Sequence, residues 1–411
     1  MNHVLIIGFV WPEPKSSAAG SRMMQLIHAF QSQNYTIIFA SPCAKTDNAF
    51  DLESIGVKST AIELNNSSFD DFIKELRPDI VLFDRFMMEE QFGWRIAEHC
   101  PKTLRVLDTE DLHCLRKGRQ NAYKDNAKFD TSYLFNEFAK REIASIFRCD
   151  LSLIISEFEM ELLQNTFKIE KSLLLYLPFM LDEVTQTTVD KFPKFDERRH
   201  FTTIGNFLHE PNFNAVWNLK ETIWPLIKQQ LPNAELHIYG AYASQKVNDL
   251  HNEKDGFLIK GFAEDVNEVM RNSKVCLAPI RFGAGLKGKL IDAMTNGTPF
   301  VTTTIGAEGL YVNSENSDNV TDDPMAFANR AVDLYNNDEH WRIQQQNGFE
   351  VINERFNKVP FQNKFINRLE TLKEQLNNHR LNNFTGAMIQ HHTMQSTKFM
   401  SRWIEEKNKS L

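Results

Sequence analysis

The sequence has few features that would place this protein outside the cell or in a membrane. Its five cysteines are scattered, odd in number and free of Cys-x-x-Cys spacing, which argues against a disulfide framework and favours a reduced, cytoplasmic protein. No apolar run is long enough to cross a bilayer. The first residues, MNHVLIIGFVWPEP, lack the basic region and small-residue cleavage site of a signal peptide and are expected to form a strand.

An excess of positive charge is also missing. The net charge of −8 argues against a general nucleic-acid binder. The glycines near the N-terminus do not form the Gly-x-Gly-x-x-Gly fingerprint of dinucleotide-binding proteins. Neither a low-complexity tract nor a repeat of solenoid period is present. What remains is a composition typical of a globular enzyme, in a chain of 411 residues that is long enough to favour two domains.

Apolar strands and amphipathic helices alternate along most of the chain. Runs such as VLIIGFV and IVLFDRF are typical of parallel strands buried on both faces, and their repetition predicts twisted parallel sheets with right-handed crossovers. A polar, charged segment after Asp182 interrupts the series, which restarts at Phe201. We therefore expect an α/β protein with two Rossmann-like parallel-sheet domains facing a cleft: residues 1–185, a linker at 186–200, a second domain at 201–365 and a helical tail at 366–411.

The tail carries an apolar stripe at helical spacing. Its members are Phe399, Met400, Trp403 and Ile404. We expect this stripe to pack on the body of the protein. The neighbouring histidines His391 and His392 point to different sides of a helix, so they do not predict a metal site.

The most informative segment is PIRFGAGLKGKLIDAMTNGTPFVTTTIGAEGL, from Pro279 to Leu310. A strand runs into a glycine-rich loop with two lysines, and a helix carrying Asp292 follows. Glycines let backbone N–H groups approach an anion, the helix N-terminus adds partial positive charge, and a lysine adds a full charge. A ligand with two phosphates and a ribose would suit this loop. The structural alternative is a plain strand–helix connection, with Asp292 paired to Lys289 one turn away.

The predicted ends of the strands indicate where such a ligand would lie. Gly205, Gly240 and Pro279 each follow an apolar strand of the second half, so they should meet at one rim. Residues 8–20 and 108–113 hold the equivalent positions in the first half. The sequence thus predicts a ligand cleft between two opposing rims.

These segments resemble a known family. RFGAGLKGKLIDAM and GTPFVTTTIGAEGL resemble the donor-binding signature of GT-B glycosyltransferases, in particular the large retaining family 4. IGNFLHEPNFNAVWNLKETIWPLIKQQLPNAELHIYG resembles the opening of that donor domain, and RVLDTEDLH and IISEFE resemble acceptor-domain segments. The resemblance implies transfer of a sugar, with retention, from a nucleotide-diphosphate-sugar on the second domain to an acceptor hydroxyl on the first, in glycan or polysaccharide assembly. The implied acceptor is a glycan, a lipid-linked molecule or a protein, and membrane association is at most peripheral.

The resemblance assigns donor-binding roles. It places Lys287 at the diphosphate and Asp292 at the ribose hydroxyls. The first acid of the family's acid pair falls at Ala284, and an Arg–Lys pair common after the first donor-domain strand is missing, so Lys289 and Arg281 are expected to supply charge. The full expected set is Gly205, Asn206, Arg281, Gly283, Gly285, Lys287, Gly288, Lys289, Asp292, Gly306, Ala307 and Glu308.

The acceptor side offers candidates for the base. The acceptor-domain histidine common in the family aligns with Glu110, and Asp111 and His113 follow closely. A cluster that opens a helix after a strand projects into the cleft, where it could take the acceptor's proton. A solvated helix start, or for His113 a half-buried packing position, is the structural alternative.

Further expectations concern the rest of this rim. Lys287 is also a catalytic candidate, because it would stabilise the leaving diphosphate. Fixed positive groups make a metal or other cofactor unnecessary, and we expect neither. Gly20, Ser21 and Asp108 are expected on the acceptor side. The basic run of Arg116, Lys117 and Arg119 is expected to lie on a wet surface, with contact to an anionic acceptor as the less favoured interpretation.

Two other functions fit the same pattern. One is a nucleotide-sugar epimerase on this architecture, which would isomerise the donor without transfer. The other is a non-catalytic nucleotide-sugar binder, which the incomplete acid pair and the missing histidine keep open. Transfer to an acceptor, donor isomerisation and donor hydrolysis distinguish the three.

Overall fold

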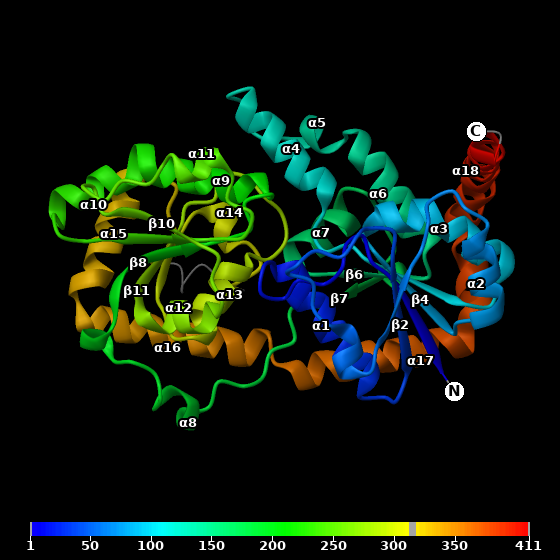
Figure 1. The fold of residues 1–411 in the computed structure, drawn as a ribbon, viewed down its shortest axis with the longest axis horizontal. Helices are drawn as coiled ribbons and strands as arrows, with labels where there is room; N and C mark the ends of the chain where they lie inside the picture. Colours follow the sequence, from blue (N-terminus) through cyan, green and yellow to red (C-terminus); the bar gives the residue numbers. More distant parts are fainter. Residues whose placement is uncertain (1, 312–317, 410–411) are drawn as a thin grey trace.

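In the computed structural model, which describes residues 2–311 and 318–409, the chain forms two parallel sheets flanked by helices (Figure 1). The first sheet has seven strands in the order β3-β2-β1-β4-β5-β6-β7. Their bounds are β1 His3–Ile7, β2 Thr36–Ser41, β3 Lys58–Ala61, β4 Ile80–Asp84, β5 Leu104–Asp108, β6 Leu151–Ile154 and β7 Leu174–Tyr176. Alternate residues of β1 enter separate cores, Val4 and Ile6 on one face and Leu5 and Ile7 on the other, as expected for a strand covered on both sides.

The helices of the first domain connect these strands. They are α1 Ala18–Gln31, η1 Leu52–Ile55, α2 Ser68–Leu76, α3 Arg85–His99, α4 His113–Lys124, α5 Thr131–Leu134, α6 Glu137–Arg148, α7 Glu157–Asn165 and η2 Lys171–Leu173. Residues 131–148 do not form one continuous helix, because the chain breaks before α6. Asn136 has an extended backbone, and its side chain accepts a hydrogen bond from the Ala139 N–H, so this residue starts a new helix.

The second sheet has five parallel strands in the order β10-β9-β8-β11-β12. They are β8 Arg199–Ile204, β9 Leu236–Tyr239, β10 Phe257–Gly261, β11 Ser273–Ala278 and β12 Phe300–Thr302. The helical segments around them are α8 Gln186–Val189, η3 Phe195–Glu197, α9 Glu210–Asn218, η4 Leu219–Ile223, α10 Trp224–Gln230, α11 Gln245–Asn248, α12 Val266–Asn272, α13 Gly288–Thr295, α14 Thr304–Ala307, α15 Pro324–Asn336 and α16 Asp338–Arg355. The two predicted Rossmann-like domains are thereby confirmed.

Pro225 lies inside a long helical stretch, where a proline can kink the helix. The structure instead widens the helix just before the proline, because Leu219–Ile223 forms a π-helical turn, η4, between α9 and α10. Proline lacks an N–H, and its ring pushes against the carbonyl four residues earlier. A wider turn relieves that clash while the helix continues.

The last two helices, α17 Lys358–Asn382 and α18 Phe384–Lys409, belong to the first domain (Figure 1). Phe365, Ile366, Leu369 and Leu372 of α17 are buried in the same core as β1. The helix that contains the expected domain boundary at residue 365 therefore completes the first domain.

The apolar stripe of α18 does not pack as expected. Phe399, Met400 and Trp403 are each more than half exposed. The side of α18 that faces α3 and α6 carries small and polar residues instead: a Cβ on Gly386 would meet the Phe147 carbonyl, and the buried Ser401 hydroxyl accepts from Arg95. The helix therefore docks through the face whose small residues allow the helix backbones to approach closely.

The chain crosses between the domains at two adjacent points. The Leu181 N–H donates to the Phe356 carbonyl, and the Lys358 N–H donates to the Leu181 carbonyl, both at 2.8 Å. Within the described residues, no helix combines the length and apolar character needed to span a bilayer.

Candidate active site

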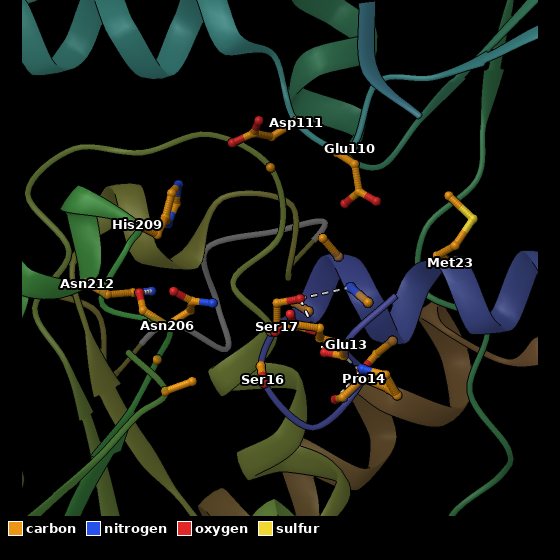
Figure 2. Close-up of a pocket in the computed structure, with 18 of the residues that line it drawn as sticks. Glu13, Pro14, Ser16, Ser17, Met23, Glu110, Asp111, Asn206, His209 and Asn212 are labelled. Carbon is orange, nitrogen blue, oxygen red and sulfur yellow. Dashed lines mark hydrogen bonds between the residues drawn. The ribbon is translucent and has the colours of Figure 1, made fainter. Parts of the chain in front are cut away.

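A cavity of about 690 Å³ lies between the carboxyl ends of the two sheets. Gly205, Gly240 and Ile280 line it from the second domain, and Gly20 and Glu110 line it from the first. The two predicted rims therefore face each other, as Figure 2 shows for part of the lining. The predicted site residues that line the cavity are Gly20, Ser21, Glu110, Asp111, His113, Gly205, Asn206, Gly283, Gly285, Lys287, Gly288, Lys289 and Asp292.

The glycine-rich loop joins β11 to α13, and Lys287 is the N-cap residue of that helix. Its side chain makes no capping hydrogen bond, so the first-turn amides of α13 have no side-chain acceptor from the cap. Gly288 opens the helix where a Cβ would lie only 2.5 Å from the Ala18 Cβ. Glycine at this position lets the N-termini of α13 and α1 meet across the domain boundary.

The Lys287 ammonium folds back on its own loop. Its Nζ donates to the Gly285 carbonyl at 2.6 Å and more weakly to the Ala284 carbonyl at 3.3 Å. Burial lowers the pKa of Lys287, which Glu308 partly opposes. A buried cation held only by neutral carbonyls has a strong electrostatic reason to pair with an anion in the cavity.

The Gly285 amide was expected to be free to bind an anion, but it already has a partner. Its N–H donates to Glu159 Oε1 at 2.9 Å, and the same oxygen accepts from the Leu112 N–H at 2.9 Å. Glu159 Oε2 is buried without a hydrogen-bond partner, and burial, reinforced by Asp111, raises the pKa of Glu159 to about 7. Gly285 has φ +62, a left-handed backbone that turns its amide toward this first-domain carboxylate.

Asp292 projects from the first turns of α13. Lys289 does not pair with it, because the Lys289 Nζ donates to Asn212 Oδ1 at 2.9 Å. Burial raises the pKa of Asp292 to about 7 and lowers the pKa of Lys289 to about 8. Both groups therefore titrate close to physiological pH, as is common for polar groups in a closed functional site.

Four expected donor-binding residues do not line the cavity: Arg281, Gly306, Ala307 and Glu308. Arg281 Nε donates to Asn214 Oδ1, and its guanidinium lies over the ring of Tyr123. Gly306 is buried in the short helix α14, where its N–H donates to the Thr303 hydroxyl. These residues therefore stabilise the surroundings of the loop.

Glu308 binds an arginine that was expected in solvent. The Arg119 guanidinium donates two hydrogen bonds to the Glu308 carboxylate, at 2.7 and 2.5 Å, and a third to the Gly283 carbonyl at 2.9 Å. Arg119 is only 7% exposed, so the wet-surface interpretation is wrong for this residue. The pair joins α4 of the first domain to the glycine turn of the second.

Asp108 was expected on the acceptor side but does not line the cavity. It is fully buried and accepts three hydrogen bonds from the Arg22 guanidinium, which also donates to the Leu177 carbonyl. Burial alone would lower the pKa of Arg22, but the paired Asp108 keeps the pKa of Arg22 raised. This ion pair ties α1 to β5 and positions the residue that follows two places later, Glu110.

Glu110 points its carboxylate into the cavity toward α1 (Figure 2). Its backbone is left-handed, with φ +62, which is uncommon for glutamate and turns the chain sharply after β5. Burial, reinforced by Asp108 and Asp84, raises the pKa of Glu110 to about 8, although Arg85 and Arg22 oppose the rise. A carboxyl in this environment exchanges its proton near neutral pH.

Asp111 and His113 have different partners. Arg116 Nη1 lies 2.7 Å from Asp111 Oδ1, and although burial alone would raise the pKa of Asp111, Arg116 and His113 hold it below its usual range. The His113 Nδ1 lies 3.2 Å from the Asp111 carbonyl oxygen, and its ring packs edge-on against Phe86. Asp111 is therefore a permanent anion, and His113 is mostly buried.

Sequence reasoning missed several lining residues. Arg85 has φ +70 and lies over the Phe9 ring, and His209 faces the cavity with its pKa lowered by burial to about 3. Glu159 was also missed; it does not line the cavity but holds the glycine loop through the Gly285 amide. The segment 13–17 curls under the cavity before α1 (Figure 2). Two signals were available, since Arg85 directly follows the buried strand β4 and Glu159 lies within the IISEFE stretch that resembles an acceptor-domain segment.

The second domain matches a family of known enzymes. Residues 198–337 match the family model of glycosyl transferases group 1. The second domain is thus a glycosyl transferases group 1 domain, and the chain as a whole has the GT-B fold.

This glycosyltransferase resembles solved structures over most of its length. A crystal structure of a TarM point mutant from S. aureus, in complex with fondaparinux, alpha-GlcNAc-glycerol and UDP, superposes with a TM-score of 0.69 at 11% identity, covering 90% of this chain and 100% of that chain. HepE from Anabaena, in complex with UDP and glucose, gives a TM-score of 0.65 at 13% identity, covering 90% and 99%. At these identities the similarity shows a shared fold.

A curated relative of the glycosyltransferase comes from Klebsiella pneumoniae. It is an uncharacterized 44.6 kDa protein in the cps region, 24% identical over 292 residues, which are 67% of this chain and 71% of the relative.

Proposed function

We propose that this glycosyltransferase moves a sugar from a nucleoside-diphosphate-sugar to an acceptor hydroxyl, with retention at the anomeric carbon. The observation that carries the proposal is the pairing of two sets of groups across one cavity. The uncapped N-terminus of α13, Lys287 and Asp292 lie on one side, and Glu110 lies on the other.

The donor would bind to the second domain. First-turn amides of α13 and the Lys287 ammonium would hold the diphosphate, once Lys287 exchanges its loop carbonyls for phosphate oxygens. Asp292, one turn into the helix, would accept hydrogen bonds from ribose hydroxyls. The UDP in the TarM and HepE complexes supports a nucleoside diphosphate as the leaving group.

The leaving diphosphate carries charge that must be stabilised as the glycosidic bond breaks. Fixed amides, Lys287 and Lys289 would supply that stabilisation, so the proposed transfer needs no metal ion. Because burial lowers the pKa values of both lysines, an incoming diphosphate would restore their charge.

The acceptor would enter from the first domain. Glu110 is the group we assign to receive or relay the proton of the acceptor hydroxyl, because its carboxyl is buried, faces the cavity and has a pKa near 8. Gly20 and Ser21 lie on the same wall and would contact the acceptor. Asp111, held by Arg116, would contribute fixed negative charge rather than proton transfer.

Polysaccharide assembly is the proposed setting, with a glycan or a lipid-linked or protein-borne glycan as acceptor. The support is the relative encoded in the cps region of Klebsiella pneumoniae.

Donor binding can be tested with the full chain and a panel of UDP, GDP, ADP and dTDP. One nucleotide should raise the melting temperature, because a ligand that binds only the folded state stabilises it. Lys287→Ala should weaken that nucleotide at least tenfold by calorimetry, whereas Lys246→Ala, an exposed lysine of the same domain, should leave it unchanged. Equal affinity in the Lys287 variant would show that the loop is not the phosphate site.

The reaction is tested with the donor sugar of the same nucleotide and candidate acceptors. Transfer that keeps the anomeric configuration, read by NMR of the product, would support the proposal. Donor isomerisation without transfer would identify an epimerase, and binding with neither transfer nor donor hydrolysis would identify a non-catalytic binder.

A further inference from the structure

A second cluster of side chains that could bind a ligand lies at the amino-terminal ends of two strands of the second sheet. His200 is near the start of β8, Glu235 immediately precedes β9, and His237 is the second residue of β9. The active-site cavity lies at the carboxyl ends of these same strands. The cluster is therefore separated from the cavity by the length of the sheet and plays no part in the proposed transfer.

The three side chains converge on one point. The His237 Nε2 lies 2.8 Å from Glu235 Oε2, and the His200 ring stacks on the His237 ring with centroids 3.6 Å apart and planes 18° apart. One nitrogen or oxygen from each residue lies within 4.8 Å of the others. Stacked rings direct their nitrogen lone pairs in parallel, so a single ion would meet all three residues once one imidazole turns out of the stack.

The backbone is arranged to bring the rings together. His200 has φ +40, a left-handed conformation that costs a non-glycine residue on the order of 1 kcal/mol. Hydrogen bonds hold the neighbouring residues: the Phe201 N–H donates to the Glu235 carbonyl, and the Thr202 side-chain hydroxyl donates to the His237 carbonyl. The strain at His200 is thus fixed by its neighbours, and it places one imidazole on another.

The donor set suits a metal ion. Each imidazole offers a ring nitrogen, and Glu235 offers a carboxylate oxygen next to the His237 ring. Metals bind neutral imidazole and ionised carboxylate, and protonation competes with them.

Positive groups also face the cluster and would oppose a cation. Lys260 and Arg199 both lower the pKa of His200. Each is exposed, so water and salt screen its charge. Glu235, by contrast, contacts the proposed ion directly and neutralises one of its charges.

We propose that His200, Glu235 and His237 form a binding site for a divalent transition-metal ion of the Zn²⁺ type, with water as the fourth ligand. Two imidazole nitrogens and one carboxylate oxygen are a donor set that Zn²⁺ accepts, whereas Mg²⁺ and Ca²⁺ prefer oxygen ligands throughout. Bound there, the ion would brace β8 against β9 and stabilise the second domain.

The test uses tag-free full-length protein treated with EDTA and then dialysed. Calorimetric titration with ZnCl₂ should show one saturable equivalent, and the melting temperature should rise with Zn²⁺ concentration. MgCl₂ at the same concentrations should give neither effect. Substitution of Co²⁺ should give visible d–d absorption from a site of nitrogen and oxygen ligands.

Variants decide whether the cluster is the site. Glu235→Gln and His237→Ala should each weaken Zn²⁺ at least tenfold, and Glu235 is half exposed, so its variant should fold even if the His237 variant does not. His391→Ala removes an exposed histidine, and Cys43→Ser removes the exposed thiol; both should bind Zn²⁺ like the parent. Absence of saturable binding, or binding that the Glu235 and His237 variants leave unchanged, would overturn the proposal.

Discussion

Glu159 Oε1 lies 2.9 Å from the Gly285 amide nitrogen, so a first-domain carboxylate holds the glycine loop of the second domain. The second oxygen of this carboxylate is buried without a partner. The contact belongs to a seam that also includes Arg119 with Glu308 and Ala18 against Gly288. Each member of the seam can be tested separately.

The Glu159 carboxyl makes stability depend on pH. Its folded-state pKa is raised from 4.5 to about 7, so its contribution is fully present below pH 4.5 and is lost as pH rises through 7. Glu159→Gln should remove this part of the slope, on the order of 3 kcal/mol between pH 4.5 and 7. Urea unfolding across that range measures it. Glu161→Gln, an exposed glutamate on the same helix, should keep the parent's slope, and an unchanged slope in Glu159→Gln would contradict the prediction.

Gly288→Ala should push the domains apart, because the new Cβ would lie 2.5 Å from that of Ala18. Small-angle scattering should show a larger radius of gyration than that of the parent. Ala18→Gly removes the opposing methyl group, so the double variant Ala18→Gly/Gly288→Ala should return to the parent's dimensions. A single variant as compact as the parent would show that the contact does not limit closure.

Arg119→Ala should lower the free energy of unfolding by about 2–4 kcal/mol, because it leaves the Glu308 carboxylate and the Gly283 carbonyl without their partner. The double variant with Glu308→Ala should lose less than the sum of the single variants, by about 1–3 kcal/mol. Denaturant titration of all four proteins measures the coupling. Arg141→Ala, which breaks an exposed pair with Glu90, should cost no more than about 1 kcal/mol. Strict additivity would argue against a direct Arg119–Glu308 interaction.

Glu110→Gln should lower turnover by about 10²–10⁴-fold, because the amide cannot take a proton. In the parent, kcat/KM should rise as the pH approaches 8, where the Glu110 carboxyl ionises. The variant should lack this limb in its pH–rate profile. Asp111 is already ionised in that range, so Asp111→Asn should retain the limb. A Glu110→Gln profile identical to the parent's would exclude Glu110 as the proton acceptor.

The fold could be predicted from sequence because it follows from local patterns. Continuous apolar runs between helices identify buried parallel strands, and the restart at Phe201 separates the two sheets. The glycine-rich loop after β11 was found for the same reason, since its glycines, lysines and helix are contiguous in the chain. The position of this loop at the carboxyl end of the sheet followed from topology alone.

The rest depended on contacts between distant residues. Arg119 was expected in water because its neighbours are basic, and only its partner Glu308, 189 residues away, explains its burial. Asp108 was expected on the acceptor side because nothing near it in the sequence indicates that it pairs with Arg22. The apolar stripe of α18 also misled, because the helix docks through Gly386 and Ser401. Local patterns identify candidate groups, and long-range pairing decides which of them reach the cavity.

The adjacency of Leu181 and Asn357 has a consequence for how the two domains are arranged along the chain. Because the first sheet ends with β7 at Tyr176 and α17, which begins at Lys358, completes the core of that sheet, the second domain is an insertion within the first. A fragment that stops near residue 185 would expose the apolar groove meant for α17. Joining 2–181 to 358–409 through a short linker should instead give a self-contained first domain, and these two junctions are where the second domain could be exchanged for another.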